Sequence, residues 1–213
     1  MFVVQKIASR GTATPAVART MLQTIELMQP FQLGPKTRED LTRVSRDLML
    51  RLMGCLDRSE PIIAQVTQSK QALAVHGVEI QAGGGAANLP AVVDLNANAE
   101  GFLFTIKQAL RDVGGLFRVF HSQQFEHRFN QALTWATQRF GAGDPLSCVL
   151  TRNAKWIERV IEMRNALEHP GGTSGTVNIC NFRVRQYRPP FEVIEPEWHR
   201  NAETPVPIAD DMA

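Results

Sequence analysis

The stretch AEGFLFTIKQALRDVGGLFRVF, residues 99–120, decides the fold class that the sequence predicts. Its apolar side chains recur every three or four positions, the period of one face of an α-helix, at Phe102, Ile106, Leu110 and Val113. The same spacing occurs in other stretches, at residues 15–31, 37–59, 123–140 and 146–168. Pro61 either kinks the second of these helices or starts a new one. We therefore expect a mainly α protein, an antiparallel helical bundle.

A small β element is expected to follow the helices. Residues 176–187, TVNICNFRVRQY, alternate in polarity and are rich in Val, Ile, Phe and Tyr, which predicts a strand. Residues 188–196, RPPFEVIEP, are its expected hairpin partner across the Pro-Pro turn. The tail beyond Trp198 is polar and contains prolines, so we expect it to be mobile.

Breaks in the pattern divide the chain into four predicted parts. Residues 1–76 form an N-terminal helical extension packing on the core, and residues 77–98 form a linker loop. Residues 99–175 form the core bundle, and residues 176–213 the β-hairpin and tail. The triple glycine at 83–85 lacks the Gly-Lys-Ser/Thr ending of a phosphate loop, so a flexible linker is expected there.

Composition excludes several classes of protein. The 213-residue chain has a formal net charge of only +2, so binding to nucleic acid would need a local basic patch. Its three cysteines show no CxxC spacing, which indicates neither a zinc site nor a disulfide framework. The sequence contains no signal-peptide core and no apolar run of about 18 residues. We expect a cytoplasmic protein without a metal, a cofactor or a membrane association.

The stretch RNALEHPGG, residues 164–172, holds the candidate site. Arg164 and His169 would lie about 140° apart on a continuous helix, but Pro170 disfavours helical backbone at the residue before it. The helix should therefore end at or just before His169, leaving its ring free to swing back toward Arg164. A guanidinium can hold a phosphate and an imidazole can transfer a proton. The alternative is ordinary helix-end chemistry, since basic residues and Pro-Gly are common there.

The motif RNALEH at 164–169 resembles that of the HEPN superfamily, and the resemblance extends over roughly residues 95–195. It implies a HEPN-like bundle and a metal-independent RNA endonuclease, in which the ribose 2′-hydroxyl attacks the adjacent phosphate. By position, Arg164 would stabilise the phosphate, His169 would transfer the proton and Asn165 would orient the arginine or the phosphate. The resemblance also implies a symmetric homodimer with a composite cleft, acting in defence, in a stress response or as a toxin with an antitoxin-like partner.

Other readings stay open at this stage. The chain could be a non-catalytic helical dimer, a regulatory module that binds a protein or a nucleotide. An acidic helper residue, present in some HEPN proteins, could be Glu100 or Asp112. Arginines interleaved with aromatic residues near the motif could contact RNA, or could form the solvated face of a strand, at Arg183, Arg185 and Arg188.

Two histidines and two tryptophans have other expected roles. His121 and His127 lack a third partner at metal-ligand spacing, which favours helix-end and surface roles. Trp135 and Trp156 lie on helical stripes and are expected in the core.

Overall fold

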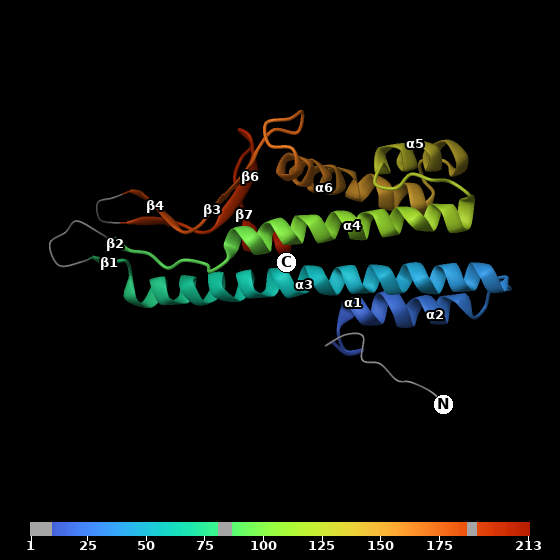
Figure 1. Ribbon diagram of the computed structural model, residues 1–213, viewed down its shortest axis with the longest axis horizontal. Helices are drawn as coiled ribbons and strands as arrows, with labels where there is room; N and C mark the ends of the chain where they lie inside the picture. Colours follow the sequence, from blue (N-terminus) through green and yellow to red (C-terminus); the bar gives the residue numbers. More distant parts are fainter. Residues whose placement is uncertain (1–9, 81–86, 187–190) are drawn as a thin grey trace. The chain divides into compact units, whose positions relative to one another are not determined.

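The computed structural model describes residues 10–80, 87–186 and 191–213 and is mainly helical, with short antiparallel strands in its C-terminal part (Figure 1). The helical elements are α1 (Pro15–Val17), a π-helical turn (Ala18–Leu22), α2 (Gln23–Met28), α3 (Pro35–His76), α4 (Leu95–His121), α5 (Phe129–Phe140), α6 (Pro145–Glu168) and α7 (Ile208–Met212). The predicted class, mainly α with a small C-terminal β element, is confirmed. The HEPN-like bundle stays a prediction, and the triple glycine at 83–85 lies outside the described residues.

Pro61 lies inside a single helix, α3, which runs unbroken from Pro35 to His76. Proline removes one helical hydrogen bond and crowds the preceding turn, at a cost of about 3 kcal/mol. The two apolar residues that follow on the buried face, Ile62 and Val66, are 0% and 2% exposed. Burying two such side chains contributes roughly 1.5–3 kcal/mol each. Packing therefore offsets the proline and keeps the helix continuous.

The chain folds into two compact units, and each is built from two separate stretches of sequence. Among the described residues, unit 1 comprises residues 10–55 and 104–161, and unit 2 comprises residues 56–103 and 162–213. The helices α3, α4 and α6 contribute to both units. Of the predicted boundaries, those after residues 76 and 175 lie in chain connections, whereas the one after residue 98 is wrong as a helix start, because α4 already begins at Leu95. The two units divide within the helices. Loops mark where the chain turns, while packing decides which segments share a core.

In unit 1, helices supply a core in which the expected apolar stripes are buried. Leu41 and Val44 of α3 are 2% and 7% exposed, and Ile106 of α4 is 8% exposed. Trp135 of α5 contacts Phe117 edge to face, with ring centroids 6.1 Å apart. The expectation for Trp156 is wrong, because this side chain is 42% exposed. The buried stripe of α6 in unit 1 runs instead through Leu150, Ile157 and Val160.

In unit 2, the predicted long strand is split in two. β3 (Val177–Cys180) pairs with β6 (Glu197–Arg200), which pairs with β7 (Val206–Pro207), while β4 (Arg183–Gln186) pairs with β5 (Glu192–Ile194). The expected partner of 176–187 is confirmed for its second half only. Asn181 separates the halves, because its Oδ1 accepts from the backbone N of Val92 at 3.0 Å and its Nδ2 donates to the Val92 carbonyl at 2.9 Å. A further short pair, β1 (Glu79–Ile80) with β2 (Ala87–Asn88), lies in the expected linker.

The expectation of a mobile C-terminal tail is wrong. Trp198 of β6 is 2% exposed, and its ring centroid lies 6.3 Å from that of Phe102. Its indole Nε1 donates a hydrogen bond to Asp211 Oδ2 at 2.6 Å. The tail ends in α7, whose Ile208 is fully buried. Seven residues of regular structure, in β7 and α7, are too few to give a visible period in the sequence.

Candidate functional site

The end of α6 lies where the sequence predicts it. Asp144 Oδ1 accepts a hydrogen bond from the backbone N of Leu146 at 2.9 Å at the start of the helix, and Glu168 is its last residue. The backbone N of His169 still donates to the Asn165 carbonyl at 2.9 Å, so the last helical hydrogen bond includes the histidine. Pro170 then ends the helix, in agreement with the prediction.

Arg164 is buried, with only 3% of the residue exposed. Its Nη1 forms an ion pair with Glu168 Oε2, four residues later on the same helix. The two side chains are 4% and 38% exposed, so the carboxylate reaches from the surface to the buried guanidinium. Burial lowers the pKa of Arg164, because it disfavours the charged form. In this conformation the carboxylate of Glu168 faces the guanidinium of Arg164.

His169 is exposed and lies just beyond the ion pair. Its ring forms no hydrogen bond or ion pair with a residue of the described ranges, so the expected approach to Arg164 is not made here. Its carbonyl accepts from the backbone N of Gly172 at 2.9 Å, which closes a tight turn. Further along the same connection, Asn201 Oδ1 accepts a hydrogen bond from the backbone N of Thr176 at 2.9 Å.

Arg200 is a charged residue of this region that sequence reasoning missed. Its Nη2 lies 2.6 Å from Glu162 of α6 and 2.7 Å from Glu203, and its side chain is 18% exposed. The hydrogen bond to Glu203 is the main reason that the pKa of Arg200 is raised. Strand β6 places Arg200 next to α6. No local sequence pattern around residue 200 predicts its ion pair with Glu162.

The arginines expected to contact RNA are paired with glutamates. Arg183 forms an ion pair with Glu197, and Arg185 lies 2.7 Å from Glu192. Between them, Val184 is 8% exposed, so the strand has one buried and one charged face. This arrangement corresponds to the solvated-strand reading. Arg188, the third candidate, lies outside the described residues, as does Tyr187.

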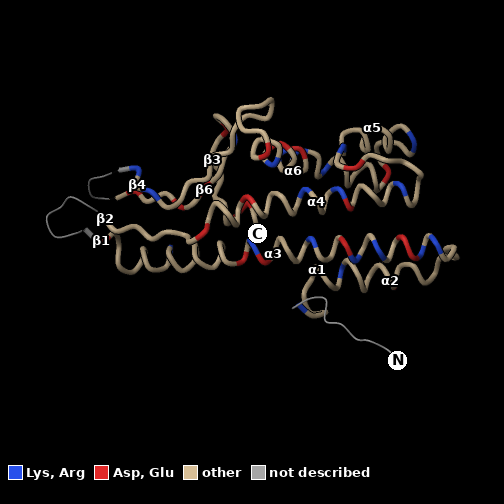
Figure 2. Tube along the Cα trace, viewed as in Figure 1, with Lys and Arg blue, Asp and Glu red and all other residues tan. Residues whose placement is uncertain are grey.

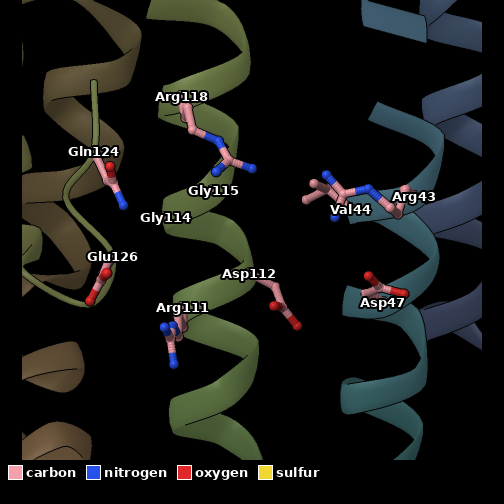
Figure 3. Close-up of a pocket in the computed structure, with 10 residues that line it drawn as sticks. All are labelled: Arg43, Val44, Asp47, Arg111, Asp112, Gly114, Gly115, Arg118, Gln124 and Glu126. Atoms are coloured by element: carbon pink, nitrogen blue, oxygen red, sulfur yellow. The ribbon is translucent and has the colours of Figure 1, made fainter. Parts of the chain in front are cut away.

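A second candidate site, a polar pocket of about 190 Å³, lies in unit 1 (Figure 3). It is lined by residues of α3, α4 and the loop after α4: Arg43, Val44, Asp47, Arg111, Asp112, Gly114, Gly115, Arg118, Gln124 and Glu126. Asp112, one of the two candidates for an acidic helper, lies here, whereas the other, Glu100, is an exposed residue of the unit 2 part of α4. Burial is the main reason that the pKa of Asp112 is raised, and the charge of Arg51 opposes the shift.

Charges of both signs alternate along the unit 1 part of α3 (Figure 2). This mixed pattern gives no single-sign surface along that segment, which agrees with the low net charge of the chain. No cluster of three or more His, Cys, Asp or Glu side chains with metal-site geometry occurs within residues 10–80, 87–186 and 191–213. Within the same ranges, no helix has the length and apolarity needed to cross a bilayer.

No family model, curated protein or solved structure matches this chain. The resemblance to HEPN proteins over roughly residues 95–195 therefore stays a prediction from the sequence.

Proposed function

We propose that the end of α6 is the active site of a metal-independent RNA endonuclease of HEPN type. The observation that carries the proposal is Arg164, a buried guanidinium held by the partly exposed Glu168, one residue before the exposed His169. The three groups span less than two turns of helix. They supply one anion-binding cation and one proton-transfer group at the same helix end.

The burial of Arg164 supports a role beyond packing. Moving a charged group out of water costs several kcal/mol even when it is paired, and an apolar side chain would fill the same space at lower cost. Charged groups perturbed by burial gather at functional sites. A carboxylate and a phosphate present the same paired oxygens to a guanidinium. Glu168 thus occupies the position that a phosphate would take, and its exposure of 38% leaves it room to move away.

The proposed reaction needs two proton transfers. The ribose 2′-oxygen forms a bond to the adjacent phosphorus while the bond from phosphorus to the 5′-oxygen breaks. One His169 accepts the proton of the 2′-hydroxyl, and His169 of a second copy donates a proton to the leaving 5′-oxygen. The products are a cyclic phosphate and a 5′-hydroxyl. Arg164 stabilises the charge on the phosphorane oxygens after Glu168 is displaced.

The test is cleavage of a labelled RNA oligonucleotide by the full chain in EDTA. We expect cyclic-phosphate ends, and a loss of about 100-fold or more in rate for His169→Gln, typical of removing a general acid or base. Arg164→Met retains much of the packing volume and should lose cleavage as well. Glu168→Gln should lower KM severalfold, because a neutral amide competes less well than a carboxylate for the guanidinium.

Two control variants test whether loss of cleavage is specific to the candidate site. His76→Gln, an exposed histidine of α3, and Arg152→Met, an exposed arginine of α6, should both cleave at the wild-type rate. Circular dichroism establishes that each variant is folded. Cleavage that persists in both His169→Gln and Arg164→Met, or an absence of cleavage by the wild-type protein, rejects the proposal.

A non-catalytic dimer is the second candidate, and an apolar cavity in unit 1 favours it. This cavity of about 420 Å³ is lined almost entirely by apolar side chains of α2, α3 and α4 and of the connection after α2. Three of them, Leu27, Phe31 and Phe120, are 67%, 60% and 55% exposed. Leu22 and Ile25 nearby are each 41% exposed, so the apolar surface continues beyond the cavity.

The occupant that we propose for this cavity is a second copy of the chain. A twofold dimer uses the same surface on both partners, and this surface holds both an apolar cavity and exposed apolar side chains that could fill it. Light scattering at micromolar concentration should give twice the chain mass for the wild type and the chain mass for Leu27→Glu with Phe31→Glu. A wild-type monomer, or a dimer that survives both substitutions, excludes this interface.

A further inference from the structure

The polar pocket of unit 1 carries an inference that is independent of the ribonuclease proposal. Figure 3 shows Arg43 of α3 and Arg118 of α4 pointing toward each other across the pocket. Asp47 and Asp112, from the same two helices, point into the space beside them. Two cations and two anions thus face one small cavity from opposite walls.

The charges of this pocket are incompletely neutralised by one another. Arg118 forms no ion pair with any residue in the described part of the chain. Arg43 pairs with Asp40 at 3.1 Å and Asp47 with Arg46 at 3.3 Å, and neither of these partners lines the pocket. Asp112 Oδ2 is buried and accepts no hydrogen bond from a described residue, and the nearest cation, Arg51 Nε, is 3.7 Å away. The charge of Asp47 raises the pKa of Asp112 further. A hydrogen-bond donor, best a positively charged one, would stabilise a buried carboxylate oxygen that lies next to a second carboxylate.

Glycines shape the floor of the pocket. A β-carbon on Gly115 would meet no atom within 4 Å, so the absence of a side chain there leaves open space. A β-carbon on Gly114 would lie 1.8 Å from the carbonyl oxygen of Glu126, so the loop after α4 packs directly on the helix backbone. Glu126 and Ser122 of that loop have φ of 52° and 56°, a left-handed backbone that costs about 1 kcal/mol or more for such residues.

The size and charge of the pocket define the class of ligand. A volume of about 190 Å³ corresponds to roughly six water molecules at ~30 Å³ each, and lies below the ~300 Å³ of ordinary drug-sized sites. The facing arginines and aspartates sum to zero charge, which gives no net attraction for a phosphate dianion. Three carboxylates line the pocket, Asp47, Asp112 and Glu126, but no such group within the described residues has the geometry of a metal site. A neutral molecule with separated charges satisfies both the arginine pair and the aspartate pair.

We propose that this pocket binds a small zwitterion, an α-amino acid with roughly five to seven non-hydrogen atoms. Its carboxylate lies between Arg43 and Arg118, and its ammonium group lies between Asp47 and Asp112. The exposed Gln124 at the rim offers an amide to a polar side chain of the ligand. The apolar side chain of Val44 offers no hydrogen-bonding group on its part of the wall, which disfavours larger polar ligands.

The proposal is tested by calorimetry of the full chain with glycine, alanine and serine. We expect at least one of them to bind with a Kd below about 10 mM. Arg118→Gln and Asp47→Asn should each weaken binding about tenfold or more, because each removes one charge-assisted contact. Arg38→Gln, an exposed arginine in the first turn of α3, should leave binding unchanged. Neither pocket variant removes a fully buried side chain, so both are expected to fold.

Two further probes carry only one of the two charges. Inorganic phosphate and methylammonium should each bind at least tenfold more weakly than the best amino acid, because phosphate satisfies only the two arginines and methylammonium only the two aspartates. Phosphate that binds as tightly as the amino acids, and is unaffected by Asp47→Asn, would identify a simple anion site and overturn the proposal. Absence of binding by all three amino acids at about 10 mM overturns it too.

Discussion

The carbonyl oxygen of Glu126 lies 1.8 Å from the position that a β-carbon on Gly114 would take. No side chain fits between them, so α4 and the loop that follows it touch backbone to backbone. Glu126 has a left-handed backbone, with φ of 52°, and both Gly114 and Glu126 line the polar pocket. Gly114 and its neighbour Gly115 are adjacent in sequence and face different surroundings, which makes them a matched pair for mutation.

Gly114→Ala should destabilise unit 1, because the loop at 122–128 must move off the helix to make room for the methyl group. We expect the free energy of unfolding in urea to fall by about 1–3 kcal/mol. Gly115→Ala meets open space and replaces a poor helix former, so it should raise that free energy by roughly 0.5–1 kcal/mol. Equal effects of the two substitutions would show that the backbone contact does not form.

Glu168→Ala should lower the free energy of unfolding by more than the removal of both members of the ion pair does. The single substitution leaves the guanidinium of Arg164 buried without its carboxylate, at about 3 kcal/mol, the low end for a buried pair since Glu168 is 38% exposed. Arg164→Met combined with Glu168→Ala removes both charges and should cost less than Glu168→Ala alone. The measurement is a double-mutant cycle in urea. Additive effects would mean that the two side chains do not interact.

Trp198→Phe should loosen the C-terminal end of unit 2. The change keeps most of the buried ring and removes the 2.6 Å hydrogen bond from the indole to Asp211. A hydrogen bond to a charged group is worth about 1.5–3 kcal/mol, so the free energy of unfolding should fall by about 2 kcal/mol. Hydrogen exchange in residues 206–213 should also accelerate. Trp156→Phe, at a side chain that is 42% exposed, is the control and should be nearly neutral.

Asp112 should make stability fall as pH rises through the acidic range. Burial raises the pKa of Asp112 in the folded protein, so the native state holds this proton more tightly than the unfolded state does. The contribution of Asp112 to the free energy of unfolding is fully present below its pKa in the unfolded chain, about 3.9. It is lost as pH rises through its higher pKa in the folded protein. Urea unfolding of wild type and Asp112→Asn between about pH 3 and 7 measures the difference. Relative to wild type, the variant should become more stable as pH rises, and a difference independent of pH would contradict the shift.

Local signals in the sequence predicted where the main helices lie but not all of their bounds, since residues 123–140 were expected to be helical and α5 begins only at Phe129. α6 begins at Pro145 and ends at Glu168, within one residue of the expected bounds, because Asp144 caps its start and Pro170 prevents its continuation. The mainly α class follows from the same periodic pattern. The pairing of β5 with β4 could also be predicted, since the sequence Pro-Pro, which favours a turn, separates two β-rich stretches.

Contacts between residues far apart in the sequence decided which tryptophan is buried and where the predicted strand breaks. Trp156 lies on an apolar stripe and is nevertheless exposed, whereas Trp198 lies among polar residues and is buried. The strand broke at Asn181 because its amide bonds to Val92, 89 positions earlier in the chain. Such contacts leave no periodic trace, because their partners are distant in sequence.

By itself the sequence determined the helices, the end of α6 and the order of Arg164, Glu168 and His169, since backbone conformation depends on neighbouring residues. Tertiary packing decided that Arg164 is buried and paired with Glu168, and that charged residues of α3 and α4 line one polar pocket. Burial and pairing depend on which surfaces pack together. These packed surfaces exist only in the folded protein, and the free energy of burying a side chain depends on all the groups that surround it there.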